Sequence, residues 1–302
     1  MDRSNRLWTR SMTLNALKNN LKLLKSVERR LARRRVRSAA VEAEALLRHF
    51  GGVNRLDFFI GKKSLDCRAK KAVEGALRIR GSGTPLWYIL KKAPFYGHDF
   101  FVSKDTLIPR PETELLVEEA IKILDTQTSP RPHVLDIGTG SGCIAVSLTI
   151  ARPHCKMTAL DFSRSALTVA RKNIRFKGLE KKIELIQSDL FSSLDGISKG
   201  YWDLIVSNPP YIDSKDLRKL PREVRSEPRL ALDGGVRGLA VIFRILAQAP
   251  AYLRKGGWMI LEIGAGQARI LKQKIERDGV LKHLRFVKDH AGIDRVLLGQ
   301  KI

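Results

Sequence analysis

Short apolar runs alternate with helix-patterned stretches along residues 133–298 of this 302-residue chain. The runs have the length of strands, and the stretches between them are long enough for a helix. Two strands joined through a helix pair in parallel within one sheet. The alternation therefore predicts an α/β fold, a mostly parallel sheet with helices on both faces. The expected strands are 133–137, 157–160, a run ending near 185, 204–206, 258–263 and 296–298.

The N-terminal part of the chain has a different pattern. Between Met12 and Ile79 apolar residues recur every three or four positions without strand-like alternation. This spacing predicts a small helical domain. We expect Gly51-Gly52 to separate two helices and the turn-rich residues 81–85 to end the domain.

A hairpin is expected between the two patterns. Residues 95–108 are aromatic and β-branched, and Gly97-His98-Asp99 is a turn sequence. Glu112 and Glu114 after Pro111 then suit the first turn of a helix. We therefore divide the chain into a basic helical substrate-recognition domain, residues 1–82, a hairpin linker, residues 83–110, and an α/β domain, residues 111–302.

The net charge of +25 is unevenly distributed. Residues 1–80 contain 21 basic and 7 acidic side chains and so contribute +14 of that total. Such a basic region favours contact with RNA or a ribosome-associated partner, although a merely solvated surface is an equally good interpretation. No apolar run reaches the roughly 18 residues of a membrane span, and no secretory signal is evident, so we expect a cytoplasmic protein without membrane contact.

Neither the cysteines nor the histidines have the spacing of a metal site. The three cysteines are far apart and include no Cys-x-x-Cys pair. The six histidines are scattered, with no serine or cysteine nucleophile paired to them. The sequence therefore predicts neither a metal centre nor a disulfide framework.

A glycine-rich loop, residues 138–142, follows the first expected strand. Glycines at such a strand-to-helix junction let the backbone approach a ligand closely, although a plain tight turn would use them too. Asp161 ends the next strand, where an acid can accept hydrogen bonds from both hydroxyls of a ribose. Asp189, beside Leu190, either receives an adenine amino group or is an ordinary loop acid. The sequence thus favours a nucleoside-containing cofactor, with Ser163 as a simple helix N-cap.

The sequence Asn208-Pro209-Pro210-Tyr211 comes directly after the fourth expected strand. If the first and fourth strands are neighbours, this loop and the glycine loop meet at one crevice. The prolines have no N–H, so the loop offers carbonyl oxygens and the Asn208 side-chain oxygen to an NH2 donor. Tyr211 could pack against a planar group or a sulfonium cation. A rigid turn would explain the prolines but not the asparagine and the tyrosine.

Several segments of the chain resemble one known family. The glycine loop with Asp161 is similar to the S-adenosylmethionine site of class I methyltransferases. Asn-Pro-Pro-Tyr resembles the signature of enzymes that methylate planar amino or amide nitrogens. From about residue 36 to the C-terminus the chain resembles the release factor glutamine methyltransferases, the HemK-like or PrmC family. The further segments that support this are Leu107–Glu114, Glu223-Val224 with Glu227–Gly235, and Ala291–Val296.

The resemblance implies a seven-stranded methyltransferase sheet preceded by the helical domain and the hairpin. It also implies S-adenosylmethionine as cofactor and, as substrate, the glutamine of the Gly-Gly-Gln motif in class 1 peptide chain release factors. The implied cofactor residues are Gly138, Thr139, Gly140, Ser141, Gly142, Asp161, Asp189, Leu190 and Asn208. The residues implied to hold and align the glutamine amide are Phe101, Asn208, Pro209, Pro210 and Tyr211.

Two other functions fit parts of the sequence. A nucleic-acid methyltransferase would present the exocyclic amine of adenine or guanine, flipped or single-stranded, to the same loop. The high positive charge supports that alternative, but no RNA-binding module is recognisable. A non-catalytic RNA- or ribosome-binding protein could retain the fold, although its two loops would then have no reason to be intact.

Overall fold

The computed structural model describes residues 3–194 and 199–302, with side chains from Leu14 onward. The chain forms two compact units that meet in the sequence between Leu90 and Lys91. This division falls after the boundary near residue 82 that the sequence suggests. The short helix α5 (Leu86–Leu90) belongs to the first unit.

The first unit is helical, as the three- and four-residue spacing predicts. Its longer helices bury one apolar face each in a common core that includes Leu31, Leu46 and Leu77. Gly52, in the left-handed conformation with φ of 58°, ends the second helix as expected. Besides α5, the helices are α1 (Arg3–Arg33), α2 (Ala39–Gly51), α3 (Arg55–Phe59) and α4 (Cys67–Gly81).

The second unit begins with a hairpin of β1 (Lys92–Phe95) and β2 (His98–Phe101). The turn is Tyr96-Gly97, both with positive φ, as in a two-residue turn of the primed type. The expected turn at residues 97–99 is therefore one residue too late, because the required left-handed conformation at Tyr96 is not evident from its residue type. The hairpin itself is confirmed.

Seven strands of the described residues form one sheet in the order β5-β4-β3-β6-β7-β9-β8. The first five in this order are parallel neighbours, and β9 runs antiparallel to both β7 and β8. The six strands expected from the sequence are present, and the predicted fold class is confirmed. The bounds are β3 (His133–Ile137), β4 (Lys156–Asp161), β5 (Ile183–Gln187), β6 (Trp202–Ser207), β7 (Leu253–Glu262), β8 (Leu281–Lys288) and β9 (Asp294–Lys301).

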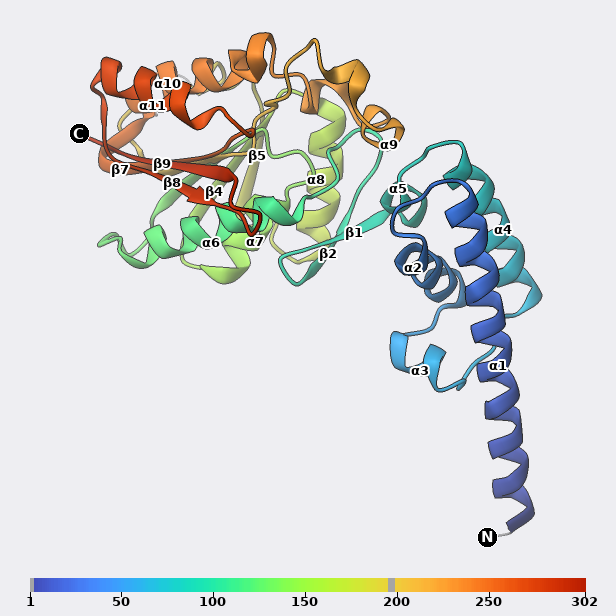
Figure 1. Cartoon of the computed structure of the whole chain (residues 1–302). Coiled ribbons are helices and arrows are strands. Elements are labelled where there is room, and N and C mark those ends of the chain that lie inside the picture. Colours follow the sequence, from blue (N-terminus) through green and yellow to red (C-terminus); the bar gives the residue numbers. More distant parts are fainter. Residues whose placement is uncertain (1–2, 195–198) are drawn as a thin grey trace. The chain divides into compact units, whose positions relative to one another are not determined.

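Helices cover both faces of this sheet (Figure 1). Residues of α6, α7 and α8 belong to the core on one face, and residues of α10 and α11 to the core on the other. Figure 1 shows α10 and α11 above the strands and α6 and α7 below them. The helices are α6 (Pro111–Asp125), α7 (Cys143–Ala151), α8 (Arg164–Phe176), α9 (Arg222–Arg225), α10 (Ala240–Tyr252) and α11 (Ala268–Asp278), with single 3-10 turns at Leu217–Lys219, Arg229–Ala231 and Val236–Gly238.

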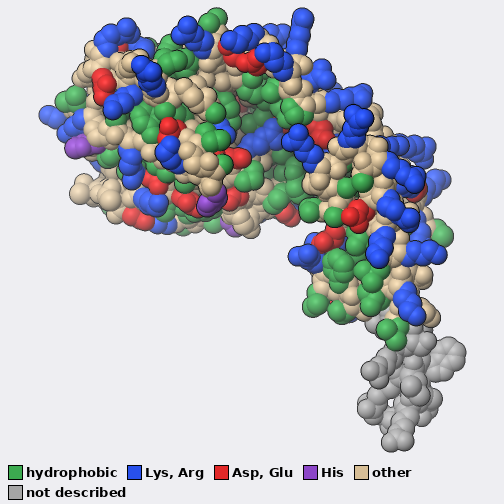
Figure 2. Space-filling model, in the orientation of Figure 1, with side chains coloured by type: hydrophobic (Ala, Val, Ile, Leu, Met, Phe, Trp, Pro, Cys, Tyr) green, Lys and Arg blue, Asp and Glu red, His purple; other side chains and the backbone are tan. Residues whose placement is uncertain are grey.

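Basic side chains are abundant on the face of the helical unit seen in Figure 2. Among the helices that the structure describes, none is both long enough and apolar enough to span a membrane.

Candidate active site

The glycine loop and the Asn-Pro-Pro-Tyr loop start from neighbouring strands. β3 pairs in parallel with β6, with Ile137 opposite Ser207 in the register. The Ser207 hydroxyl also donates a 2.6 Å hydrogen bond to the Ile137 carbonyl oxygen. The strand order changes direction at β3, since β4 and β5 lie on one side of β3 in the sheet and β6 lies on the other. Ligands of open α/β sheets bind at such a switch point.

The glycine loop has a backbone that leaves space for a ligand. Gly138, Gly140 and Gly142 have φ values of 71°, 56° and 80°, which residues other than glycine rarely adopt. A Cβ added to Gly138 would meet no atom within 4 Å. The loop is held from beneath, because Thr139 N donates to Leu160 O at 2.8 Å. Open space above a fixed loop suits a cofactor that lies against the backbone.

Asp161, at the end of β4, faces this loop. One of its carboxylate oxygens accepts from Gly140 N and the other from Ser163 N, both at 2.8 Å. Each oxygen retains a second acceptor position, so the carboxylate can still accept from two hydroxyl groups. Burial raises the pKa of Asp161, against these two backbone hydrogen bonds. The Ser163 hydroxyl accepts from Ala166 N at 3.2 Å, which confirms it as the N-cap of α8.

Asp136 lies beneath the loop and is completely buried. Its Oδ2 accepts a 2.6 Å hydrogen bond from the Thr139 hydroxyl. Its Oδ1 has no hydrogen-bond partner within the described parts of the chain. Burial raises the pKa of this carboxyl to about 7. Thr139 is therefore held by a buried acid, which orients it within the candidate cofactor loop.

Asn208 is held in one orientation by a chain of hydrogen bonds. Its Nδ2 donates to the Thr113 hydroxyl at 3.0 Å, and that hydroxyl donates to Glu262 Oε2 at 2.6 Å. Since the Thr113 hydroxyl proton is used in the hydrogen bond to Glu262, only the lone pairs of that oxygen face Asn208. The Asn208 amide must therefore present its NH2 group to Thr113. Its Oδ1 accepts no hydrogen bond from any described residue. That oxygen is left as an acceptor for a substrate N–H.

Tyr211 belongs to the same network. Its hydroxyl donates to Glu262 Oε1 at 3.1 Å, so one buried carboxylate binds both Thr113 and Tyr211. Burial and the nearby Glu262 carboxylate raise the pKa of Tyr211 and keep it protonated. The Tyr211 carbonyl oxygen accepts from Gln267 Nε2 at 3.0 Å. The side chain and the backbone of Tyr211 are therefore both fixed.

Close backbone packing of Gly234 and Gly238 supports the Asn-Pro-Pro-Tyr loop. A Cβ added to Gly238 would lie 1.9 Å from the Tyr211 carbonyl oxygen, and one added to Gly234 would lie 2.6 Å from the Pro210 carbonyl oxygen. Side chains cannot be accommodated at such distances without moving the backbone. The two glycines therefore set the position of the loop.

The other predicted site residues have different surroundings. Phe101 N donates to Asn173 Oδ1, and Asn173 Nδ2 donates to the carbonyl oxygens of Phe101 and Ser141. Asn173 thus joins β2 to the glycine loop. The Phe101 ring packs edge-on against Phe176, with Lys172 Nζ 3.9 Å from its centroid. Its role at the amide site stays a prediction.

Asp189 and Leu190 lie in the loop after β5. Asp189 Oδ2 accepts a 2.8 Å hydrogen bond from Arg244, and both side chains of this pair are about half exposed. Leu190 has a φ of 52°, a conformation that is unusual for a leucine. Their contact with an adenine also stays a prediction.

Two family models match this chain. The "Methyltransferase small domain" model matches residues 112–224, which include both loops, and the "PrmC N-terminal domain" model matches residues 22–90, most of the helical unit. A release factor glutamine methyltransferase from Geobacter sulfurreducens is 40% identical over 89% of this chain and 92% of its own length. One from Chlorobaculum tepidum is 37% identical over 92% of this chain and 95% of its own length.

The chain belongs to the release factor glutamine methyltransferase family. The resemblance stated from its motifs is therefore confirmed. The catalytic domain of human Mettl16 superposes with a TM-score of 0.54 over 74% of this chain and 81% of its own, at 18% identity. A likeness at that identity shows that the methyltransferase fold is shared.

Thr113, Glu262 and Asn173 contact predicted site residues of this family member but were not identified from the sequence. Glu262 had a detectable signal, because it is an acid at the end of the apolar run 258–263, which the parallel pattern places in the middle of the sheet. Thr113 lies in the family-like segment Leu107–Glu114, but nothing in that segment indicates Asn208 as its partner. Asn173 had no signal, since it is an ordinary helix residue whose partners are distant in sequence.

Glu227 also has a partner that the sequence does not suggest. It is buried, and its carboxylate accepts from Ile108 N at 3.0 Å and from the Arg110 guanidinium at 2.5 Å. Its neighbours in sequence, Arg225 and Arg229, are not the ion-pair partners. These contacts give Glu227 a structural role, in which it holds residues 108–110.

We expect Glu262 to make stability depend on pH. Burial raises its pKa from 4.5 to about 7, against hydrogen bonds from Thr113 and Tyr211. Between these values the folded protein keeps a proton that the unfolded chain has lost, so the contribution of Glu262 falls as the pH rises. The free energy of unfolding of wild type relative to Glu262→Gln should fall by on the order of 3 kcal/mol from pH 5 to pH 8.

Urea unfolding of both proteins at the two pH values measures this difference. The control is Glu276→Gln, which changes an exposed glutamate on α11. An identical pH dependence of wild type and Glu262→Gln would show that Glu262 does not titrate in this way.

Proposed function

We propose that this protein transfers a methyl group from S-adenosylmethionine to the side-chain amide nitrogen of the Gly-Gly-Gln glutamine in class 1 release factors. The observation that supports this best is the orientation of Asn208, whose amide oxygen is left as an acceptor directly after β6, the strand that pairs with β3 before the glycine loop. Family membership supports the same substrate, since the relatives are release factor glutamine methyltransferases.

The residues of the first loop fit the proposed cofactor. Gly138 leaves open space above the backbone, and Asp161 retains acceptor positions for two ribose hydroxyls. We assign cofactor contacts to the stretch 138–142, Asp161, Asp189, Leu190 and Asn208. When bound, S-adenosylmethionine supplies an electrophilic methyl group on a sulfonium centre. The chain itself contributes the orientation of the acceptor.

The amide nitrogen of glutamine is a poor nucleophile because its lone pair is delocalised into the carbonyl group. In our proposal Asn208 Oδ1 and the Pro209 carbonyl oxygen accept the two amide hydrogens and turn the nitrogen toward the glycine loop. Pro210, which also lacks an N–H, offers no competing donor, and Tyr211 and Phe101 pack beside the amide plane. Orienting the reactants can lower a barrier by about 7–11 kcal/mol, and preorganised acceptors add to this.

The basic side chains of the N-terminal helix α1 favour a second partner besides the release factor. Lys18, Lys22, Lys25, Arg29 and Arg33 follow at intervals of three or four residues and are all exposed, so they form one stripe along α1. Like charges at such spacing destabilise a helix by about 0.2–0.5 kcal/mol per pair, a cost that a polyanion would remove. We propose that this stripe binds the phosphates of RNA, for example those of ribosomal RNA.

Labelled cofactor given to the protein with separate pools of release factor and RNA tests the proposed function. We expect mass spectrometry to find the label on the glutamine of the Gly-Gly-Gln motif and none on a factor whose glutamine is replaced by alanine. Label in RNA would instead favour methylation of an exocyclic base amine, and cofactor binding without any transfer would favour a non-catalytic role.

RNA binding in the same samples tests the stripe. Five phosphate contacts predict a slope of about −3.5 for the logarithm of the binding constant against that of the salt concentration, for single-stranded RNA. The double variant Lys22→Gln/Arg29→Gln should reduce the slope by about 1.4. Lys71→Gln, an exposed lysine of α4, is the control. An unchanged slope in the double variant would show that the stripe does not bind RNA.

A further inference from the structure

The chain that follows the Asn-Pro-Pro-Tyr loop makes a closed excursion, residues 212–235. Its ends lie together, because Ile212 forms a parallel bridge with Asp233. Ile212 N donates to Leu232 O at 3.1 Å, and Gly234 N donates to Ile212 O at 2.9 Å. Since Ile212 follows Tyr211 directly, the excursion begins and ends beside the candidate amide site.

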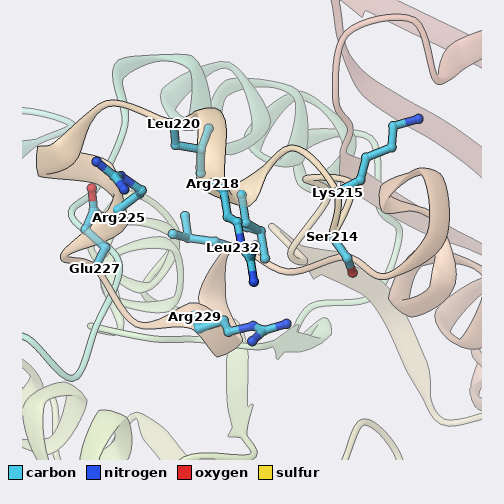
Figure 3. Close-up of a pocket in the computed structure, with 9 residues that line it drawn as sticks. Ser214, Lys215, Arg218, Leu220, Arg225, Glu227, Arg229 and Leu232 are labelled. Atoms are coloured by element: carbon cyan, nitrogen blue, oxygen red, sulfur yellow. The ribbon is translucent and has the colours of Figure 1, made fainter.

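An open pocket of about 600 Å³ lies within this excursion (Figure 3). Leu217, Leu220 and Leu232 provide an apolar lining, to which Arg218 and Arg225 add two guanidinium groups. Figure 3 shows Arg225 at one end of the pocket, with Leu220, Leu232 and Arg218 toward its centre. The pocket thus combines apolar contact with positive charge.

The two guanidinium groups are not neutralised by neighbouring acids. Arg229 and Lys215 form ion pairs with Asp233 and Asp213, at 3.0 and 3.2 Å. Neither Arg218 nor Arg225 forms an ion pair with any residue that the structure describes. Glu227, the acid that lines the pocket, is already bound to Arg110 and Ile108 N. Two cations therefore remain for an external anion.

We infer that this pocket docks a second segment of the release factor, one in which an acidic side chain stands next to an apolar one. The inference rests on the proposed function and adds a specificity-determining surface to it. A phosphodiester backbone is charged and polar, so it would gain little binding free energy from contact with three leucine side chains. Single-stranded RNA sites combine basic groups with aromatic stacking platforms, and no aromatic side chain is among the residues that line this pocket.

The pocket and the amide site are connected through α6 and the residues just before it. Glu227 binds Ile108 N and Arg110, which come just before α6, and α6 carries Thr113, the partner of Asn208. A segment held in the pocket would therefore keep the glutamine near Asn208 at a high effective concentration. Docking of this kind changes KM for the whole factor and not the chemical step.

Steady-state kinetics of the double variant Arg218→Glu/Arg225→Glu tests the inference. We expect its KM for intact release factor to rise about tenfold or more, with kcat changed less than about twofold. For a short peptide that contains only the Gly-Gly-Gln motif, kcat/KM should equal that of wild type. Arg222→Glu, an exposed arginine of the same excursion that does not line the pocket, is the matched control and should behave as wild type. A lysine in place of the docked acid of the factor should restore KM for the double variant.

The possible results separate the inference from the proposed function. If wild type methylates the glutamine but the double variant has an unchanged KM, the pocket is not a docking site. If the double variant loses RNA binding while KM stays the same, the pocket binds RNA and the inference is wrong. If wild type does not methylate the glutamine at all, the proposed function itself fails.

Discussion

Replacing Asn208 by alanine is expected to lower kcat by roughly two orders of magnitude or more. The substitution removes the Oδ1 acceptor that we propose for one amide hydrogen, and losses of this size follow removal of a single preorganised polar group. The affinity for S-adenosylmethionine should change far less, because Asn208 is only one of the assigned cofactor contacts and the glycine loop and Asp161 keep theirs. Initial rates at saturating release factor and an equilibrium titration of the cofactor measure the two quantities.

Thr113→Val distinguishes the contribution of the Asn208 amide from that of the hydroxyl that orients it. This variant keeps Asn208 but removes the hydroxyl that accepts from Nδ2 at 3.0 Å. The amide should then sample both of its orientations, which leaves about half of the molecules competent, and kcat should fall by about twofold, far less than in Asn208→Ala. Near-normal methylation by Asn208→Ala would refute the proposed role of the amide oxygen.

Gly238→Ala should have the largest effect on stability. Gly238 has a φ of 68°, and the added Cβ would lie 1.9 Å from the Tyr211 carbonyl oxygen and 2.8 Å from Gln267 Nε2. Because backbone must move to relieve the first contact, we expect the free energy of unfolding to fall by about 3 kcal/mol or more. The shift of the Asn-Pro-Pro-Tyr loop should also lower kcat at least tenfold. Urea unfolding and initial rates test both effects.

Gly279→Ala is the matched control for this prediction. Gly279 has a similar φ of 64°, but an added Cβ would meet no atom within 4 Å. It should therefore show only the cost of the left-handed conformation, about 1–2 kcal/mol, with normal activity. Equal losses in the two variants would mean that close packing against Tyr211 does not support the site.

Patterns that depend on local sequence predicted most of the fold. The run 133–137 matches β3 residue for residue, because a central strand buried on both faces is rich in apolar residues, here Val134, Leu135 and Ile137. β8 was not predicted, since it lies at the edge of the sheet and three of its eight residues are lysine or arginine. Edge strands commonly contain such charges, which hide the apolar pattern.

The site residues also fall into two groups, those that a local sequence pattern reveals and those that it does not. The glycine loop and Asn208–Tyr211 could be found because each is a short continuous motif at the end of a strand. The chain from Asn208 through Thr113 to Glu262 could not, because its members are separated by 95 and 149 residues and meet only in the folded sheet. Long-range hydrogen bonds of this kind leave no local pattern in one sequence.

Asn173 has a mechanical consequence for the molecule. Its single carboxamide bonds to both backbone groups of Phe101 in β2 and to the Ser141 carbonyl oxygen. The hairpin that contains β2 follows the helical unit directly in the chain, with β1 beginning at Lys92. Asn173 therefore fixes the position of β2 relative to residues 138–142, so that a substitution of this one side chain would loosen two parts of the candidate site at once.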